Sequence, residues 1–124
     1  MTDWPSILLV ALMGAVGAVL RGWFSHLPSY YGLPTGTITV NLIGSFLLGL
    51  IAALSLKWDW SPEWRLAITT GFMGAFTTFS TFSLENAKYS EQGEWRTLLT
   101  NILLQTILGI TLAYLGWTLA GRDG

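Results

Sequence analysis

The chain has 124 residues, of which 52% are hydrophobic and only 10% are charged, and its formal net charge at pH 7 is −1. Ordinary soluble domains carry about 25% charged residues, so this composition favours a membrane protein. The small net charge gives no indication of nucleic-acid binding, and the absence of cysteine excludes disulfides, thiolate metal sites and cysteine catalysis.

Charged residues divide the chain into four uncharged segments that are candidate membrane spans. They cover residues 4–20, 37–56, 66–84 and 97–121, the second beginning after a stretch rich in proline and glycine. About 20 apolar residues cross the hydrocarbon core of a bilayer. We therefore predict an all-α membrane protein with four transmembrane helices, forming one domain over residues 1–124. The first segment is not expected to be a cleaved signal peptide, because no basic residue precedes it.

Aromatic and small residues support this division. Tryptophan falls near the expected helix ends, where aromatic side chains prefer the membrane interface; the residues are Trp4, Trp23, Trp58, Trp60, Trp64, Trp95 and Trp117. Pairs of small residues spaced by four predict close approach between helices; the pairs are Gly14 with Ala18, Ser45 with Gly49, Gly71 with Ala75, and Gly109 with Ala113.

Basic residues give no preferred orientation in the membrane. The N-terminus, second connection and C-terminus carry Lys57, Arg65 and Arg122, and the first and third connections carry Arg21, Lys88 and Arg96. Orientation follows the bias of Lys and Arg near helix ends, and here the two sets balance. One interpretation is that the chain inserts into the membrane in both orientations and forms an antiparallel homodimer. The alternative is a single, weakly biased topology.

The third segment is the most informative, because hydroxyls and glycines crowd a span without charges. Polar groups at membrane depth are costly unless they face protein, water or an ion. Gly71 and Gly74 precede Thr77 and Thr78 and favour a break in the helix at mid-membrane. Such a break frees backbone carbonyls, and a bound cation is one way to satisfy them.

Two phenylalanines in this segment, Phe79 and Phe82, are three residues apart and lie beside Ser80 and Ser83. The edges of aromatic rings carry partial positive charge, so ring edges and hydroxyls together can receive a small anion. The alternative is a packing stripe softened by hydroxyls that bond to the preceding helical turn.

The ten residues Gly74 to Ser83, GAFTTFSTFS, resemble the signature of the Fluc (CrcB) family of fluoride channels. The resemblance extends over the whole chain and includes Arg21 and the sequence TVNLIG that contains Asn41. Ala75 is a departure, since the family commonly has a second glycine there. The resemblance implies a fluoride-selective channel that exports fluoride from the cytoplasm by passive electrodiffusion.

The family assembly is also implied by this resemblance. It is an antiparallel, dual-topology homodimer in the cell (inner) membrane, with two fluoride pathways and a third helix broken at mid-membrane. A structural sodium ion, which is not transported, is held at the break by main-chain carbonyls, here those of Gly74 and Thr77.

The residues of the fluoride pathway follow from the same match. On this chain they are Asn41, Phe79, Phe82, Ser80, Ser83 and Thr81, with Arg21 at the vestibule and Glu85 after the signature. In the fourth helix the polar candidates are Asn101, Gln105, Thr106 and Thr111, and spacing favours Gln105 with Thr106.

Two other classes of protein compete with this reading. A small dual-topology multidrug or cation transporter needs a membrane-embedded carboxylate, but no Asp or Glu occurs between Trp4 and Leu56, which leaves Glu85 as its sole candidate. An intramembrane enzyme or assembly factor is disfavoured, because His26 is the only histidine and falls in a connection. We therefore expect a channel and no enzymatic activity.

Overall fold

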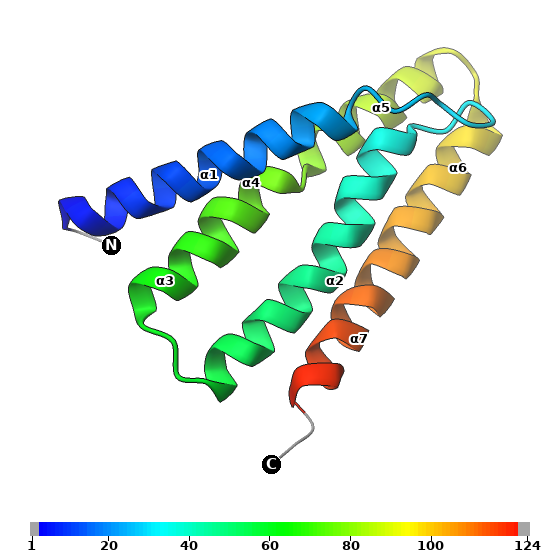
Figure 1. Ribbon diagram of the computed structural model, residues 1–124. Helices are drawn as coiled ribbons and strands as arrows, with labels where there is room; N and C mark the ends of the chain where they lie inside the picture. Colours follow the sequence, from blue (N-terminus) through cyan, green and yellow to red (C-terminus); the bar gives the residue numbers. More distant parts are fainter. Residues whose placement is uncertain (1–2, 122–124) are drawn as a thin grey trace.

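The computed structural model describes residues 3–121, which form helices joined by short connections (Figure 1). In chain order the elements are α1 Trp4–Phe24, α2 Thr35–Lys57, α3 Pro62–Leu66, η1 Ala67–Met73, α4 Gly74–Phe76, α5 Phe79–Glu91, α6 Trp95–Leu103, η2 Leu104–Leu108 and α7 Gly109–Gly121. The segments η1 and η2 are π-helical. Arg122, one of the basic residues used to assess topology, lies outside the described residues.

Three helices among the described residues are long and apolar enough to cross a membrane. They are Trp4–Phe24, Thr35–Lys57 and the continuous helix Trp95–Gly121 formed by α6, η2 and α7. These confirm the first, second and fourth predicted spans, each somewhat longer than expected. The third predicted span is not among them, because Thr77 and Thr78 separate α4 from α5.

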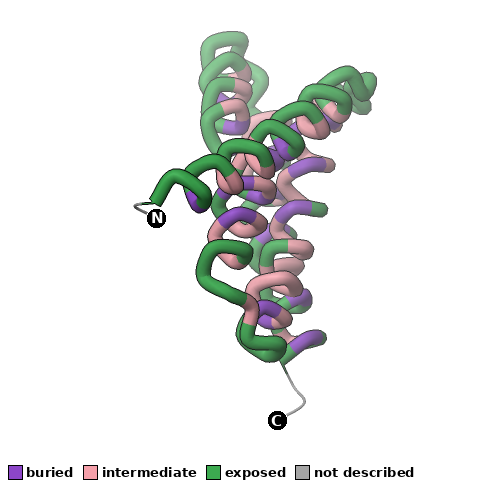
Figure 2. The backbone as a smooth tube through the Cα atoms, turned by 60° about the vertical axis from the view of Figure 1, so that its left-hand side comes forward, coloured by how far each residue is buried: buried purple, intermediate pink, exposed green. Residues whose placement is uncertain are grey.

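The helices pack in two groups that meet at the interruption. Helix α1 lies against η1 and α4, whereas α2 lies along α7 for much of its length (Figure 1). Buried residues are confined to the faces where these helices meet, and the outer faces are exposed (Figure 2). The outer face of α1 is an apolar stripe, as expected of a lipid-facing or subunit-facing helix; it consists of Leu8, Leu12, Val16 and Val19.

Tryptophans occupy the helix ends, as the sequence predicts. Trp4 begins α1, Trp58 follows α2 and Trp95 begins α6. Six of the seven are exposed, with 44–75% of their surface accessible, and Trp60 is half-buried. Exposed tryptophans at helix ends are typical of side chains that lie at the membrane interface.

Glycines allow the close approach of backbones in both groups. The carbonyl oxygen of Gly71 would lie 3.5 Å from a Cβ built on Gly14, and a Cβ on Gly49 would overlap the carbonyl of Ala113. Two of the predicted small-residue pairs are thus at the α1–η1 contact and two at the α2–α7 contact. At Gly49, and at Gly71, where a Cβ would lie 2.8 Å from the carbonyl oxygen of Val10, the missing side chain is what lets the helices touch.

Alanine substitutions on α1 test this packing with a matched pair. A Cβ at Gly17 would overlap the backbone carbonyl of Phe72, whereas a Cβ at Gly22 would meet nothing within 4 Å. We expect Gly17→Ala to lower the free energy of unfolding by roughly 1–3 kcal/mol through overpacking. Gly22→Ala should leave it unchanged or raise it by up to about 1 kcal/mol through helix propensity. Thermal unfolding in detergent measures both, and equal stability of the two variants would contradict the expectation.

Candidate functional site

The helical path is interrupted at two threonines between α4 and α5. Thr77 has φ −86° and ψ 161°, and Thr78 has φ −151° and ψ 110°, so both are extended. The Oγ1 of Thr78 accepts a hydrogen bond from the N–H of Thr81 at 3.1 Å and so caps the N-terminus of α5. Threonine suits this position because it is β-branched and is a good N-cap residue.

Asn41 of α2 holds the interruption in place. Its Nδ2 donates to the carbonyl of Thr78 at 3.1 Å, and its Oδ1 accepts from the N–H of Thr78 at 2.8 Å. One carboxamide thus satisfies both backbone groups of a residue that has left the helix, as buried polar groups require. One turn further along α2, a Cβ on Gly44 would overlap the methyl group of Thr77, so the absence of a side chain makes room for the interruption.

The interruption leaves two backbone carbonyls without the N–H donors that a continuous helix would give them. In an unbroken α-helix the N–H of Thr78 would donate to the carbonyl of Gly74, and the N–H of Thr81 to that of Thr77. Here these N–H groups donate to Asn41 Oδ1 and Thr78 Oγ1 instead. The carbonyls of Gly74 and Thr77 therefore lose their helical partners, and these are the two carbonyls named from the family resemblance.

A cavity of about 250 Å³, here called the ring cavity, lies beside the interruption. It is lined by Asn41, Gly44, Ser45, Leu48, Thr77, Thr78, Phe79, Phe82, Gln105 and Thr106. The fold therefore brings together, from α2, α5 and η2, five residues that the sequence analysis assigned to one pathway. Ser45 was not assigned to it; its position four residues after Asn41, on the same face of α2, is the signal that could have found it.

The two phenylalanines of the ring cavity differ in burial. Their ring centroids are 5.7 Å apart, with the ring planes tilted by 44°. Phe82 is 9% exposed, whereas Phe79 is 78% exposed. Phe82 thus belongs to the wall of the cavity, and Phe79 stands at its open rim.

Four side-chain amides form a continuous hydrogen-bonded row, here called the carboxamide chain, that runs away from the ring cavity. Asn41 Nδ2 donates to Gln105 Oε1 at 2.7 Å, Gln105 Nε2 donates to Asn101 Oδ1 at 2.8 Å, and Asn101 Nδ2 donates to Asn86 Oδ1 at 3.0 Å. Asn101 was one of the four polar candidates of the fourth helix. Asn86 was not identified from the sequence, since only the packing of α5 against α6 brings it to Asn101.

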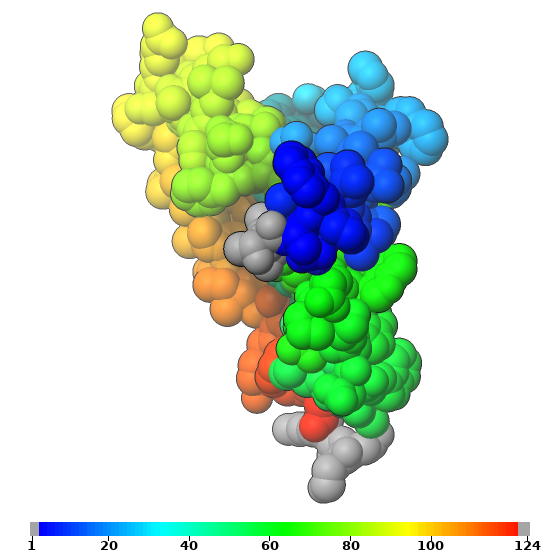
Figure 3. Space-filling model, turned by 90° about the vertical axis from the view of Figure 1, so that its left-hand side faces the viewer, coloured from blue at the N-terminus to red at the C-terminus, as the bar shows by residue number. Residues whose placement is uncertain are grey.

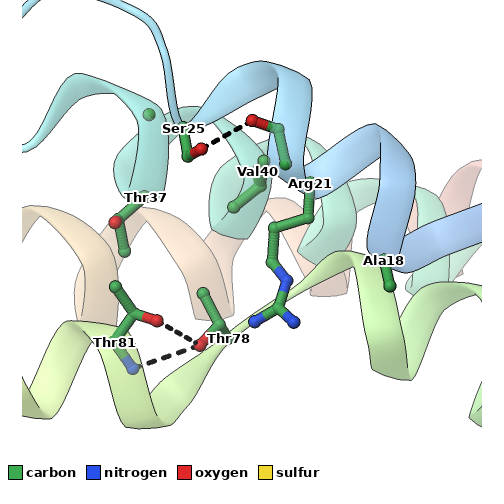
Figure 4. A pocket seen from close by; sticks show the side chains of 9 residues that line it. Ala18, Arg21, Ser25, Thr37, Val40, Thr78 and Thr81 are labelled. Carbon is green, nitrogen blue, oxygen red and sulfur yellow. Dashed lines mark hydrogen bonds between the residues drawn. The ribbon is translucent and has the colours of Figure 1, made fainter.

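A second cavity, of about 270 Å³, lies on the other side of Thr78 and is called the arginine cavity (Figure 4). It is lined by Ala18, Arg21, Gly22, Ser25, Gly36, Thr37, Val40, Thr78 and Thr81. The side chain of Arg21 extends from α1 toward the segment that carries Thr78 and Thr81 (Figure 4). Because Thr78 lines both cavities, the interruption forms part of the wall between them.

The remaining predicted residues lie outside both cavities. Glu85 accepts a hydrogen bond from Thr37 Oγ1 at 2.6 Å and lines a smaller cavity of about 190 Å³ together with Thr81. Ser83 is exposed and donates to the carbonyl of Phe79 at 2.9 Å, and Ser80 is exposed with its Oγ 3.3 Å from Thr78 Oγ1. Ser83 thus makes the back-bond to the preceding turn that the alternative reading of this segment foresaw.

Comparison with known proteins finds a matching family model and similar relatives. Residues 8–117 match the family model described as CrcB-like protein, Camphor Resistance (CrcB). A protein of Methanococcus aeolicus named fluoride-specific ion channel FluC is 45% identical over 111 residues, covering 89% of this chain and 90% of its own length. Proteins of the same name from Shewanella amazonensis and Leptospira interrogans are 46% and 40% identical, each covering 90% of this chain and at least 91% of their own length.

Proposed function

The chain belongs to the CrcB-like family, and on that premise we propose that it is a fluoride-specific ion channel of a membrane and not an enzyme. The observation that carries the proposal is the ring cavity. It unites two phenylalanines with hydroxyl and amide groups, and none of its lining residues is charged. A multidrug or cation transporter would need a coupling carboxylate among these residues, which the cavity does not contain.

The chemistry of the ring cavity suits weak, reversible binding of a small anion that is conducted through it. Ring edges and N–H or O–H donors attract fluoride, but each does so weakly in comparison with a fixed cation. Conduction requires binding that is favourable enough to enter and weak enough to leave. Arg21, in the neighbouring arginine cavity, adds a positive potential that concentrates anions close to the interruption without facing the rings. Flow is then passive and lets a cell that has accumulated fluoride lose it down its electrochemical gradient.

A second copy of the chain completes this pathway in our proposal. Phe79 lines the ring cavity although 78% of its surface is exposed, so one subunit leaves the cavity open at that ring. Gly74, which precedes the interruption, is exposed as well. An antiparallel homodimer in the cell (inner) membrane would cover both, and the balance of Lys and Arg between the two sides permits insertion in both orientations.

The residues at the interruption fit a structural sodium ion. Gly74 and Thr77 offer uncharged carbonyl oxygens whose helical donors are diverted, and such oxygens are ligands of hard cations. The described residues contain no group of three or more His, Asp or Glu that would favour a divalent metal. A bound sodium ion would supply a fixed positive charge that satisfies these oxygens, while Asn41 and Thr78 keep the backbone open to receive it.

Fluoride efflux from liposomes tests the proposed function directly. Protein reconstituted into vesicles loaded with fluoride should release it, as read by a fluoride electrode, when a potassium ionophore carries the balancing charge. Vesicles loaded with chloride are the control and should release little. Equal efflux of the two anions, or none of either, would contradict a fluoride-specific channel.

The proposed dual topology gives a separate prediction. A reporter fused to the C-terminus should be found on both sides of the membrane in one cell population, because the basic residues show no bias. Adding two or three lysines to the connection between α2 and α3 should drive one orientation and reduce fluoride efflux when that variant is expressed alone. Co-expression with a variant biased the other way should restore efflux. A uniform location of the unmodified C-terminus would refute the antiparallel dimer.

A further inference from the structure

We infer that Asn101 and Asn86 are positioning residues, which hold the carboxamide of Gln105 so that its nitrogen, and not its oxygen, serves the anion. Neither residue lines the ring cavity, whereas Gln105 does. The inference deepens the proposed function and rests on it.

The direction of the carboxamide chain is set at Asn41. The backbone of Thr78 offers an N–H and a carbonyl at fixed places, so Asn41 must turn its Oδ1 to the former and its Nδ2 to the latter. A half-turn of this side chain would place nitrogen against nitrogen and oxygen against oxygen, and two buried backbone groups would lose their partners. Such a loss costs about 1–3 kcal/mol for each group.

The same direction of hydrogen bonding continues along the carboxamide chain. Asn41 gives its second Nδ2 hydrogen to Gln105 Oε1, Gln105 donates to Asn101 Oδ1, and Asn101 donates to Asn86 Oδ1. Every link therefore runs from nitrogen to oxygen in the same sense. The row ends in the protein interior, since Asn101 is 0% exposed and Asn86 is 9% exposed. A buried network that is fully satisfied holds one arrangement of its members.

The consequence concerns which donors remain for the anion. An amide nitrogen carries two hydrogens, and Asn41 has committed both, to Thr78 and to Gln105. Gln105 has committed one of its two to Asn101, which leaves the other for a ligand in the ring cavity. Without Asn101 the Gln105 carboxamide loses one of the two bonds that orient it, and an amide oxygen that turned into the cavity would repel fluoride.

A double-mutant cycle tests this assignment on the reconstituted protein. Fluoride efflux and the ratio of fluoride to chloride efflux are measured for wild type, Asn101→Leu, Gln105→Leu and the double variant. Asn101→Leu should lower fluoride efflux about tenfold, which is the effect expected from the loss of one well-placed hydrogen bond. It should also lower the ratio of fluoride to chloride efflux. The double variant should be no worse than Gln105→Leu, because residues that act through one another are not additive. Asn86→Leu should change both quantities in the same direction by less.

Controls keep the outcomes separate. Thr100 lies beside Asn101 on α6, and its exposed hydroxyl donates to the carbonyl of Arg96, so Thr100→Val should match wild type. If Asn101→Leu does not fold, Asn101→Ala takes its place in the same cycle. Unchanged efflux and ratio in the Asn101 variant, or losses that multiply in the double variant, would overturn the inference alone. A wild type without fluoride efflux would overturn the proposed function and this inference with it.

Discussion

Replacing Phe82 by isoleucine is expected to lower fluoride efflux roughly tenfold or more, and Phe79→Ile is expected to do the same. Isoleucine fills a comparable volume but has no ring edge, so the substitution removes partial positive charge from the cavity and little else. The two variants should differ in stability, because Phe82 is 9% exposed and Phe79 is 78% exposed. Efflux per amount of reconstituted protein, with the folded fraction determined by size-exclusion chromatography, measures the effect.

Phe72→Ile is the matched control for these variants. Phe72 lies earlier in the same segment and stacks on Phe76 with ring centroids 6.1 Å apart, outside the residues that line the ring cavity. This variant removes a partly buried ring that packs against the core and should keep fluoride efflux per amount of folded protein. Wild-type efflux in both Phe79→Ile and Phe82→Ile would show that the rings are not part of the pathway.

The helical spans could be predicted from the sequence because hydrophobicity and charge decide them. The residue bounds shifted outward, since a single charged residue near the end of a helix does not stop it; α1 runs through Arg21 to Phe24 and not to residue 20. The third segment is harder to predict. Its start at Pro62 and its end at Glu91 lie beyond the uncharged stretch, and Glu85 and Lys88 fall within α5.

The candidate site, like the fold, could be predicted from the sequence only in part. Asn41, Phe79 and Phe82 could be assigned by their resemblance to a family signature, and the fold brings them to one cavity. The role of Asn41 at Thr78 and the place of Asn86 could not be predicted, because each depends on a contact between residues at least 15 positions apart. No local pattern records such contacts. The family resemblance assigned Arg21 to the vestibule of the pathway, and in the structure it lines a separate cavity across the interruption from the rings.

Removal of sodium should lower fluoride efflux about tenfold or more, if the freed carbonyls at the interruption hold this ion. A carbonyl that loses its partner on burial costs about 1–3 kcal/mol, and the proposed dimer would bury two from each subunit. Without the ion, we expect the backbone at Thr77 and Thr78 to rearrange to avoid this cost. The wall that the two cavities share would then be distorted. Efflux is measured with sodium replaced by a large organic cation at equal osmolarity, and re-adding sodium should restore it.

A variant at the interruption makes the sodium test specific. Gly44→Ala places a methyl group where the methyl of Thr77 lies, so Thr77 must move; its carbonyl should then bind the ion less well. We expect this variant to need more sodium for half-maximal efflux than wild type. Gly109→Ala is the matched control, because its added Cβ would make only an ordinary contact, 3.6 Å from Ser45 Oγ, and its sodium dependence should equal that of wild type. Efflux that is indifferent to sodium in all three proteins would remove the ion from the proposal. The ring cavity and its proposed role would then stand on the phenylalanine variants alone.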